Sequence, residues 1–324
     1  MQTTTPSTVP NTIPSSQKAV RIHQFGGPEV LVYEDAPVPT IQADEVLVKI
    51  HAASVNPVDW KVREGYLKDM LPHRLPLILG WDFAGEIVAV GSAVQGWKLG
   101  DAVYARPDIA RDGSYAEFIA VRASEIAAKP SKANWQQAAA VPLAALTAWQ
   151  SLIEGAAVQA GERVLVHAGA GGVGSFAIQL AKSRGAYVIT TTSSKNVDLV
   201  KSLGADEVID YTQQDFSQLR DIDVVFDTLG GEIQDKSWQT LKQGGRLISI
   251  ISMPSEQQAA SIGGKALFCF VQPNAQQLNE LAKMIDADQL KIVIDSVFPL
   301  TDVIGAHAKS ATGRAVGKIV IQVA

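Results

Sequence analysis

A glycine-rich segment near the middle of the chain has the residue types and spacing of a phosphate-binding loop. It reads Gly169-Ala170-Gly171-Gly172-Val173-Gly174 and directly follows the apolar stretch 163–167. In such a GxGxxG motif the first glycine permits a tight turn, and the second lets a pyrophosphate approach the backbone. The last glycine lets the following helix pack closely on the strand. Because the free N–H groups at the start of that helix face the phosphates, the segment predicts dinucleotide binding rather than a glycine-rich turn that serves packing only.

The residues after the next strand indicate which dinucleotide would bind. Sites for NAD usually place an acidic residue there, about 20 residues beyond the loop. Here the first acid is Asp198, already inside the next predicted helix, and hydroxyls, an amide and an ammonium group precede it. These groups suit a 2′-phosphate. Alternatively, they could serve only as a polar cap between the strand and the helix. We predict NADP(H) as the cofactor, held by Thr192, Ser193, Ser194, Lys195 and Asn196, with Tyr211 closing over the adenine or the phosphate.

The segments around this loop alternate between strand and helix. Apolar residues recur at helical spacing from Val173 to Ala181, and a second helix pattern stops at Gly204. Repeated strand–helix–strand units imply an α/β fold with a doubly wound parallel sheet of the Rossmann type. The predicted strands are residues 163–167, 187–191, 207–209, 224–227 and 246–250.

The first third of the chain has a different pattern. Short β-branched runs such as 46–50 and 86–90 are separated by glycines at turn positions, which predicts a mostly antiparallel β domain. Residues 291–294 and 318–323 are also β-like and could extend the nucleotide sheet or return to this first domain. We favour the return, because the doubly wound unit is already complete. The predicted domains are residues 18–137 with 285–324, and residues 138–284.

Composition excludes several classes of function. The 324 residues are 47% hydrophobic and carry a net charge of −5, with Lys and Arg scattered along the chain, so nucleic acid is not the expected partner. No apolar run approaches the roughly 20 residues that span a bilayer, and the single cysteine, Cys269, cannot form an internal disulfide. Residues 1–17 are rich in Thr, Ser and Pro and lack the patterns of a secretory signal or transit peptide, so we expect a flexible tail. A soluble, cytoplasmic protein is expected.

Four sequence segments resemble a known family. The run 80–86, GWDFAGE, and the loop segment AGAGGVG resemble the medium-chain dehydrogenase/reductase superfamily. The segments 54–61, SVNPVDWK, and 227–231, DTLGG, are most similar to its zinc-free quinone and enone oxidoreductases, which include zeta-crystallin-like proteins. This resemblance implies a GroES-like catalytic domain beside the Rossmann domain and a homodimer.

The resemblance also locates where a catalytic zinc would be held. The ligand positions fall at Asn56, at Trp81 and near Leu143 or Ala144, and none of these side chains is a zinc ligand. No cysteine precedes Cys269, and the five histidines are scattered, so we expect no metal ion. Without a Lewis acid, the favoured hydride acceptors are already electrophilic: quinones, or the β carbon of an enone.

The developing oxyanion of such an acceptor needs a donor. The resemblance places Lys61 between the nicotinamide and the substrate carbonyl, although most lysines lie on the surface. Asn56, held extended by Pro57, could orient the substrate or the nicotinamide ribose, or it could serve a turn only. Tyr66 is a further catalytic candidate, and Trp60 and Trp81 are expected to line the substrate pocket, although such aromatic residues are often core residues.

Other residues are expected around the nicotinamide end of the cofactor. Thr147, with Ala148 and Trp149, is expected to open a helix there, or to act as a cap only. Leu229, Gly230 and Ile250 would flank the nicotinamide, and Arg314 would reach the cofactor from near the C-terminus.

Two other functions remain open from the sequence. An enoyl-thioester reductase would share the cofactor site but would need a long acyl tunnel and a basic patch. A non-catalytic NADPH-binding protein, crystallin-like or RNA-binding, would keep the glycine loop without the chemistry. The expected partner is a small quinone or enone, with no membrane and no nucleic acid.

Overall fold

The computed structural model describes residues 13–324, and the predicted tail falls mostly outside them. Residues 1–12 are not among the described residues. Ser16 and Gln17 were assigned to the tail, but they begin strand β1 (Ser16–Ile22). The correction has a physical reason: Ser16 pairs with Pro37 on the neighbouring strand, and the buried Gln17 side chain accepts a hydrogen bond from Phe118 N.

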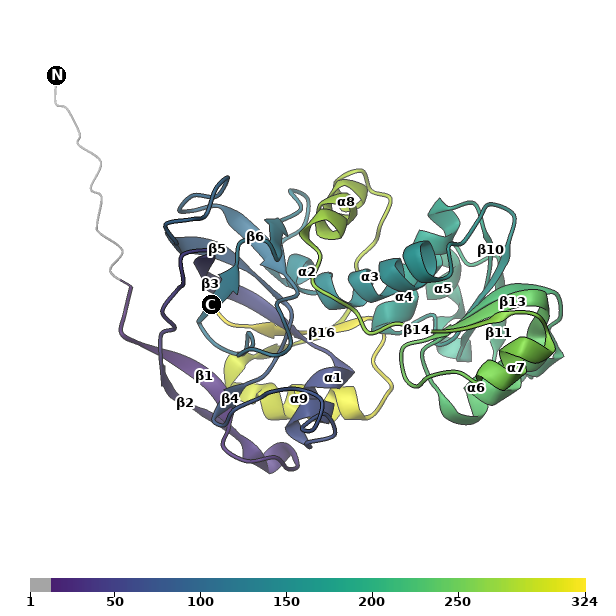
Figure 1. Cartoon of the computed structure of the whole chain (residues 1–324), viewed down its shortest axis with the longest axis horizontal. Coiled ribbons are helices and arrows are strands. Elements are labelled where there is room, and N and C mark those ends of the chain that lie inside the picture. The colour runs from purple at the N-terminus through teal and green to yellow at the C-terminus, as the bar shows by residue number, and fades with distance from the viewer. Residues whose placement is uncertain (1–12) are drawn as a thin grey trace, which may run out of the picture.

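A parallel sheet carries the glycine loop (Figure 1). Its strand order places β9 at the centre, which is the order of the dinucleotide-binding doubly wound fold. The predicted fold class is therefore confirmed. From one edge to the other, the strands are β11 (Glu207–Asp210), β10 (Tyr187–Thr192), β9 (Arg163–Val166), β12 (Ile222–Asp227), β13 (Leu241–Ser249) and β14 (Lys265–Phe268).

Alternating residues of this sheet pack into two separate apolar clusters, one on each face. Val164 and Val166 pack with Phe176 of the helix after the loop, whereas Leu165 and Ile189 pack with Trp238 on the opposite face. Both faces are thus covered, as a parallel sheet requires. The helices of this part are α4 (Gly172–Ser183), α5 (Val197–Ser202), α6 (Gly231–Ser237), α7 (Glu256–Ser261) and α8 (Ala275–Asp286).

The second large sheet contains both early strands and the end of the chain. Strand β16 pairs antiparallel with β3, so the C-terminus returns to the first part of the chain, the placement that the sequence favours. Residues 291–293 were expected in a strand, but Lys291 instead exchanges hydrogen bonds with the Gln179 side chain of α4. The strands are β15 (Ile294–Pro299), β16 (Lys318–Gln322), β3 (Glu45–Val55), β5 (Phe83–Val90), β6 (Ala102–Ala105) and β8 (Ile126–Ala128), with β7 (Phe118–Arg122) paired to β3.

A smaller sheet and several helices complete this part of the molecule. The small sheet has the order β2-β1-β4, with β2 at Leu31–Pro37 and β4 at Leu77–Ile78. The helices are α1 (Pro57–Arg63), α2 (Trp135–Ala139), α3 (Pro142–Trp149) and α9 (Val303–Ala311).

The two large sheets meet around α3 and α8. One apolar cluster contains Ala84 and Tyr104 from the antiparallel sheet together with Leu146 of α3 and Val164 of the parallel sheet. The Tyr104 hydroxyl also donates to Leu278 O of α8 at 2.6 Å. This shared core holds the glycine loop beside the antiparallel sheet. Among residues 13–324, no helix is both long and apolar enough to cross a membrane.

Candidate functional site

The glycine loop joins β9 to α4 with little free space around two of its glycines. A Cβ on Gly169 would lie 2.0 Å from Thr190 Oγ1, and one on Gly174 would lie 2.3 Å from Ala168 O. Side chains at these positions would push the helix away from the strand. The first and last glycines of the motif are therefore needed for the close packing that the sequence predicts.

The middle of the loop is more open and contacts the C-terminal strand. A Cβ on Gly171 would meet only Ala168 O, at 3.2 Å, which leaves the approach to the start of α4 free on the other sides. Gly171 pairs with Gly317, whose N–H donates to Ala170 O at 2.8 Å. The open backbone at a helix N-terminus fits a pyrophosphate, and Val173 lies half-buried in the first turn.

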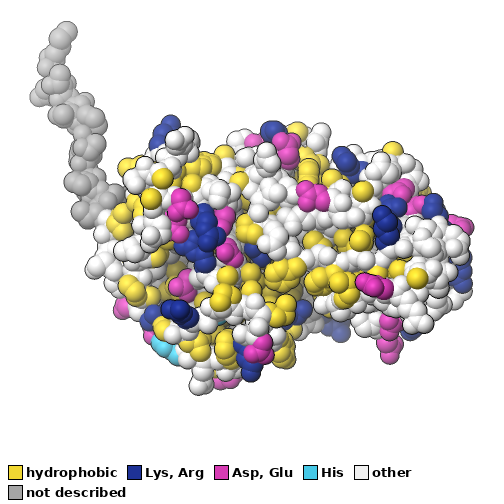
Figure 2. Space-filling model, in the orientation of Figure 1, with side chains coloured by type: hydrophobic (Ala, Val, Ile, Leu, Met, Phe, Trp, Pro, Cys, Tyr) yellow, Lys and Arg dark blue, Asp and Glu magenta, His cyan; other side chains and the backbone are white. Residues whose placement is uncertain are grey.

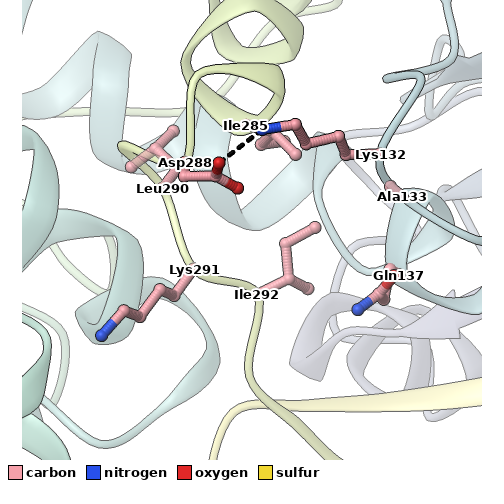
Figure 3. Close-up of a pocket in the computed structure, with 8 residues that line it drawn as sticks. All are labelled: Lys132, Ala133, Gln137, Ile285, Asp288, Leu290, Lys291 and Ile292. Carbon is pink, nitrogen blue, oxygen red and sulfur yellow. Dashed lines mark hydrogen bonds and ion pairs between the residues drawn. The ribbon is translucent and has the colours of Figure 1, made fainter.

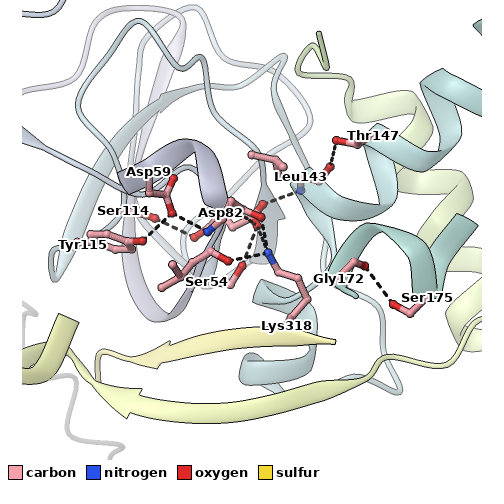
Figure 4. A network of polar contacts seen from close by, with 12 residues as sticks. Ser54, Asp59, Asp82, Ser114, Tyr115, Leu143, Thr147, Gly172, Ser175 and Lys318 are labelled. Carbon is pink, nitrogen blue, oxygen red and sulfur yellow. Dashed lines mark hydrogen bonds and ion pairs between the residues drawn. The ribbon is translucent and has the colours of Figure 1, made fainter. Parts of the chain in front are cut away.

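Next to the loop, the Lys318 ammonium lies in the protein interior (Figure 4). It donates to Val55 O at 3.1 Å, to Asn56 Oδ1, and to Asp82 Oδ2 at 3.4 Å. A Cβ on Gly172 would lie 2.9 Å from its Cδ atom, so the lysine stem packs against the loop. Because an ammonium group has three hydrogens, the three acceptors satisfy it completely.

Asp82 is the other half of this buried ion pair. Its Oδ2 accepts from Ser54 Oγ at 2.7 Å and from Asn56 Nδ2 at 2.8 Å, and its Oδ1 accepts from Leu143 N at 2.6 Å. Burial raises the pKa of Asp82 and lowers the pKa of Lys318, and their mutual attraction opposes both shifts. The pair ties β16, the end of β3 and the start of α3 together.

A second chain of buried polar groups lies beside Asn56. Arg63 Nη1 contacts His307 Nδ1 at 3.1 Å, and His307 Nε2 lies 3.3 Å from the Tyr115 hydroxyl. That hydroxyl donates to Asp59 Oδ2 at 2.7 Å. Burial raises the pKa of Asp59 to about 7 and lowers the pKa of His307 to about 3. His307 is therefore neutral. Because Arg63 can only donate, Nδ1 of His307 accepts, and the ring proton of His307 lies on Nε2.

This arrangement changes the expected role of Asn56. Its side chain is almost fully buried, with Oδ1 occupied by Lys318 and Nδ2 bonded to Asp82. Its backbone N–H donates to Asp59 Oδ2 at 2.7 Å, which caps helix α1. Asn56 therefore holds the centre of the network together, and direct contact with a substrate is not needed to explain it.

Lys61, in contrast, lies half-buried on α1. Its ammonium group has no hydrogen-bonding partner among residues 13–324 and lies 5.8 Å from the Trp60 ring. Burial lowers the pKa of Lys61. Trp60 makes an edge-on contact with Tyr66, and its buried Nε1 has no partner among the described residues. Tyr66 is 67% exposed, so the predicted Lys61, Trp60 and Tyr66 set forms one group at the surface end of α1.

Two predicted site residues lie in the core instead. Trp81 is fully buried, and its indole N–H donates to Arg111 O at 3.1 Å, so the ring packs in the interior rather than along an open pocket. Thr147 does not open a helix, because α3 already begins at Pro142, where proline suits the first helical position. Its hydroxyl donates to Leu143 O at 2.7 Å within the helix.

The residues predicted near the nicotinamide lie at the carboxyl ends of β12 and β13. Leu229 N and Gly230 N donate to Asp227 Oδ1 at 3.0 and 2.9 Å, so the turn is held in place. Gly230 has a φ of +72°, a conformation that favours glycine. Ile250 N donates to Asp227 O. Arg314 is exposed, and its role toward the cofactor stays a prediction.

The predicted phosphate-binding residues are brought together at the ends of β10 and β11. Tyr211 N donates to Thr192 O at 3.0 Å, and Asn196 Nδ2 lies 3.4 Å from Ser193 Oγ. Ser194 and Lys195 are exposed on the short 3-10 turn Ser194–Asn196.

The sequence reasoning missed one residue there. Asp210, the last residue of β11, accepts a hydrogen bond from the Ser194 hydroxyl at 2.5 Å. Asp198 is the first acid along the chain after the glycine loop, whereas Asp210 ends the neighbouring strand. The strand predicted at residues 207–209 ends one residue before Asp210, so an acid directly after this strand is the sequence signal for it.

A cavity of about 340 Å³ lies elsewhere, between α2, the end of α8 and the segment that leads back to β15 (Figure 3). None of the predicted site residues borders it, and Lys132 and Asp288 close one side with an ion pair. It therefore does not belong to the candidate site. Its lining residues are Lys132, Ala133, Gln137, Ile285, Asp288, Leu290, Lys291 and Ile292.

The described residues contain no group of three or more His, Cys, Asp or Glu side chains that could hold a metal ion. Each histidine is instead engaged with another protein group. The contacts are His23 with Glu34, His51 with Glu86, His73 with Ile109 O, His167 with Ser237, and His307 with Arg63.

Comparison with known proteins agrees with this geometry. Residues 42–131 match the family described as "Alcohol dehydrogenase GroES-like domain", and residues 203–321 match the family described as "Zinc-binding dehydrogenase". The solved "quinone oxidoreductase from Coxiella burnetii" superposes with a TM-score of 0.89 and 37% identity, over 95% of this chain and 100% of that one.

Two curated relatives align over 95% of this chain and 80% of their own length. They are the "2-methylene-furan-3-one reductase" of Solanum lycopersicum, 39% identical, and the "NADPH-dependent alkenal/one oxidoreductase, chloroplastic" of Arabidopsis thaliana, 38% identical. The chain belongs to the medium-chain dehydrogenase/reductase superfamily, in its quinone and enone oxidoreductase branch. This medium-chain enzyme is an oxidoreductase with a nicotinamide cofactor.

The buried ion pair gives a direct test of the network. Lys318→Met leaves the Asp82 carboxylate without its cation, and Asp82→Asn leaves the ammonium without its anion. Each single variant should lower the free energy of unfolding by about 3 kcal/mol, measured by urea denaturation followed by circular dichroism. The double variant should lose clearly less than the sum of the two single losses. Additive losses would show that the two charges are not coupled.

Proposed function

We propose that this enzyme is an NADPH-dependent reductase that transfers a hydride to quinones or α,β-unsaturated carbonyl compounds without a metal ion. The observation that carries the proposal is the composition of the polar centre beside the glycine loop. At the positions where the family resemblance implies zinc ligands, this chain has an amide, an indole and a backbone N–H, and these groups bond to protein partners. The names of the relatives point to the same acceptors and to NADPH.

A bound nicotinamide would supply the hydride, and the protein would supply position and charge. Hydride addition to the β carbon of an enone moves an electron pair onto the carbonyl oxygen, and a proton must then reach the α carbon. The oxyanion needs a donor, because no Lewis acid is proposed. For a quinone, the same transfer followed by a proton gives the hydroquinone.

Lys61 is the proposed donor to that oxygen. Unlike Lys318, whose three hydrogens are all used inside the protein, Lys61 has no hydrogen-bonding partner among the described residues. Its half-buried position strengthens the attraction between the ammonium group and a developing oxyanion, because less water screens the two charges. Trp60 and Tyr66 beside it offer apolar surface to a planar acceptor.

We also propose the domain division predicted from the sequence, with residues 18–137 and 285–324 as the catalytic domain and 138–284 as the nucleotide domain. The pairing of β16 with β3 supports it. Figure 2 shows hydrophobic side chains across the middle of one face of the molecule. The lone Cys269 suits a reducing compartment such as the cytoplasm.

The first test is NADPH consumption without oxygen, against one planar quinone and one short-chain enone. We expect turnover with at least one acceptor, and Lys61→Met should lower kcat with the enone by about tenfold to a hundredfold, because one oxyanion donor is lost. The affinity for NADPH should stay unchanged.

Lys68→Met is the matched control, because Lys68 is an exposed lysine outside the proposed group. If neither acceptor is reduced despite tight NADPH binding, the proposed activity is wrong. Full turnover by Lys61→Met would remove only Lys61 from the mechanism.

The proposed preference for NADPH has a separate test. The double substitution Ser193→Ala and Lys195→Ala removes a hydroxyl and a cation from the proposed 2′-phosphate site. It should weaken NADPH binding by about tenfold or more and NADH binding little, since charge-assisted hydrogen bonds are strong. Titration of the intact protein by nicotinamide fluorescence measures both. Equal weakening of the two cofactors would contradict the assignment, and Lys201→Ala, on the exposed face of α5, is the control.

We further propose a homodimer. Strand β14 is an edge of the parallel sheet in the described chain, and Phe268 at its end is 40% exposed. An open strand edge with apolar side chains is a ready site for pairing with another strand. Light scattering at micromolar concentration should give the mass of two chains, and a single-chain mass at all concentrations would exclude the dimer.

A further inference from the structure

The adenosine end of the cofactor site contains a carboxylate that the proposed function does not use. Asp210 pairs with Thr192 in the register of β10 and β11, so the carboxyl ends of the two strands lie side by side. Thr192 is the first of the proposed phosphate-binding residues, and Tyr211 directly follows Asp210. Asp210 therefore lies among the groups that would surround the 2′ position of the adenosine ribose.

The hydrogen bonds of this carboxylate are fully used by its neighbours. Oδ1 accepts from Thr212 N at 3.0 Å and from Thr212 Oγ1 at 2.7 Å. Oδ2 accepts from Ser194 Oγ at 2.5 Å and from Gln213 Nε2 at 2.9 Å. These four donors, the Ser194 hydroxyl first, hold the pKa of Asp210 below its usual range. The side chain is therefore negatively charged at neutral pH.

This geometry has two consequences for a 2′-phosphate. A serine hydroxyl has one hydrogen to donate, and Ser194 donates it to Asp210, so it is not available to a phosphate oxygen. In addition, a fixed negative charge beside the site repels a phosphate that carries nearly two negative charges. NADH has a neutral hydroxyl at the same position and would experience neither effect.

We propose that Asp210 is a specificity residue that weakens binding of the 2′-phosphate, so that the enzyme retains useful affinity for NADH beside NADPH. The inference rests on the proposed function, because it assumes that Ser193, Ser194 and Lys195 lie at the 2′ position. Lys195 attracts the phosphate and Asp210 opposes it. The preference of the enzyme for NADPH over NADH then depends on the difference between the attraction by Lys195 and the repulsion by Asp210.

Asp210→Asn tests this directly in the full-length chain. The amide keeps an oxygen for Thr212 and removes the charge. Its NH2 group at the Oδ2 position no longer accepts from Ser194 or from Gln213, which frees the serine hydrogen. NADPH should bind about tenfold more tightly, because one charge-assisted hydrogen bond becomes available. NADH affinity should stay within about twofold by the same fluorescence titration, since its 2′-hydroxyl carries no charge.

Two further variants separate the hydrogen bond from the charge. Asp198→Asn removes another carboxylate, an exposed one in the first turn of α5, whereas Asp210 is 9% exposed; it should leave the NADPH to NADH ratio unchanged. In a Ser194→Ala background, Asp210→Asn should gain less than it does alone, because only the charge effect remains. The melting temperature of each variant checks that the substitution does not unfold the protein.

The outcomes distinguish this inference from the proposed function. An unchanged NADPH to NADH ratio in Asp210→Asn, or an equal increase in Asp198→Asn, overturns the role of Asp210. The Ser193→Ala and Lys195→Ala double variant tests the phosphate site by itself. It should weaken NADPH binding, whereas Asp210→Asn should strengthen it. A gain in Asp210→Asn together with a loss in that double variant supports both.

Discussion

An ammonium group that leaves water must find an acceptor for each of its hydrogens, and the interior of this enzyme supplies three of them to Lys318. They belong to the end of β3, to Asn56 and to Asp82. The backbone of the preceding residue, Gly317, bonds to the glycine loop. Because removal of either charge leaves the other buried without a partner, the geometry between the loop and the antiparallel sheet depends on this pair.

The two lysines near the candidate site have different physical tasks. Lys318 is buried with every donor occupied, so it holds protein groups together. Lys61 is half-buried with no hydrogen-bonding partner among the described residues, so it has donors to offer a ligand. The same residue type therefore holds protein groups together in one place and has unused donors in the other, and the difference lies in the number of acceptors that surround it.

The two ends of the proposed cofactor site differ in a similar way. Around Asp82 and Asp59 the carboxylates are fully buried, and burial raises the pKa of both. At the adenosine end, Asp210 is 9% exposed, and its four hydrogen bonds, that of Ser194 first, lower its pKa. Substitutions at the two interior carboxylates should therefore act mainly through stability, whereas Ser194 and Lys195 are exposed, so substitutions there should change stability little.

The sequence by itself determined the parallel sheet, the position of the glycine loop and the branch of the superfamily, because each depends on local periodicity or on a short contiguous motif. The roles of separate residues needed the tertiary structure. Trp81 and Thr147 each carry a hydrogen-bond donor, and the sequence places both near the predicted site. Only the tertiary structure shows that these donors bond to backbone carbonyls inside the protein. The ion pair of Lys318 and Asp82 joins residues that most of the chain separates. The hydrogen bond from Ser194 to Asp210 joins the ends of two neighbouring strands. Such contacts leave no local pattern, because folding and not sequence spacing brings the two side chains together.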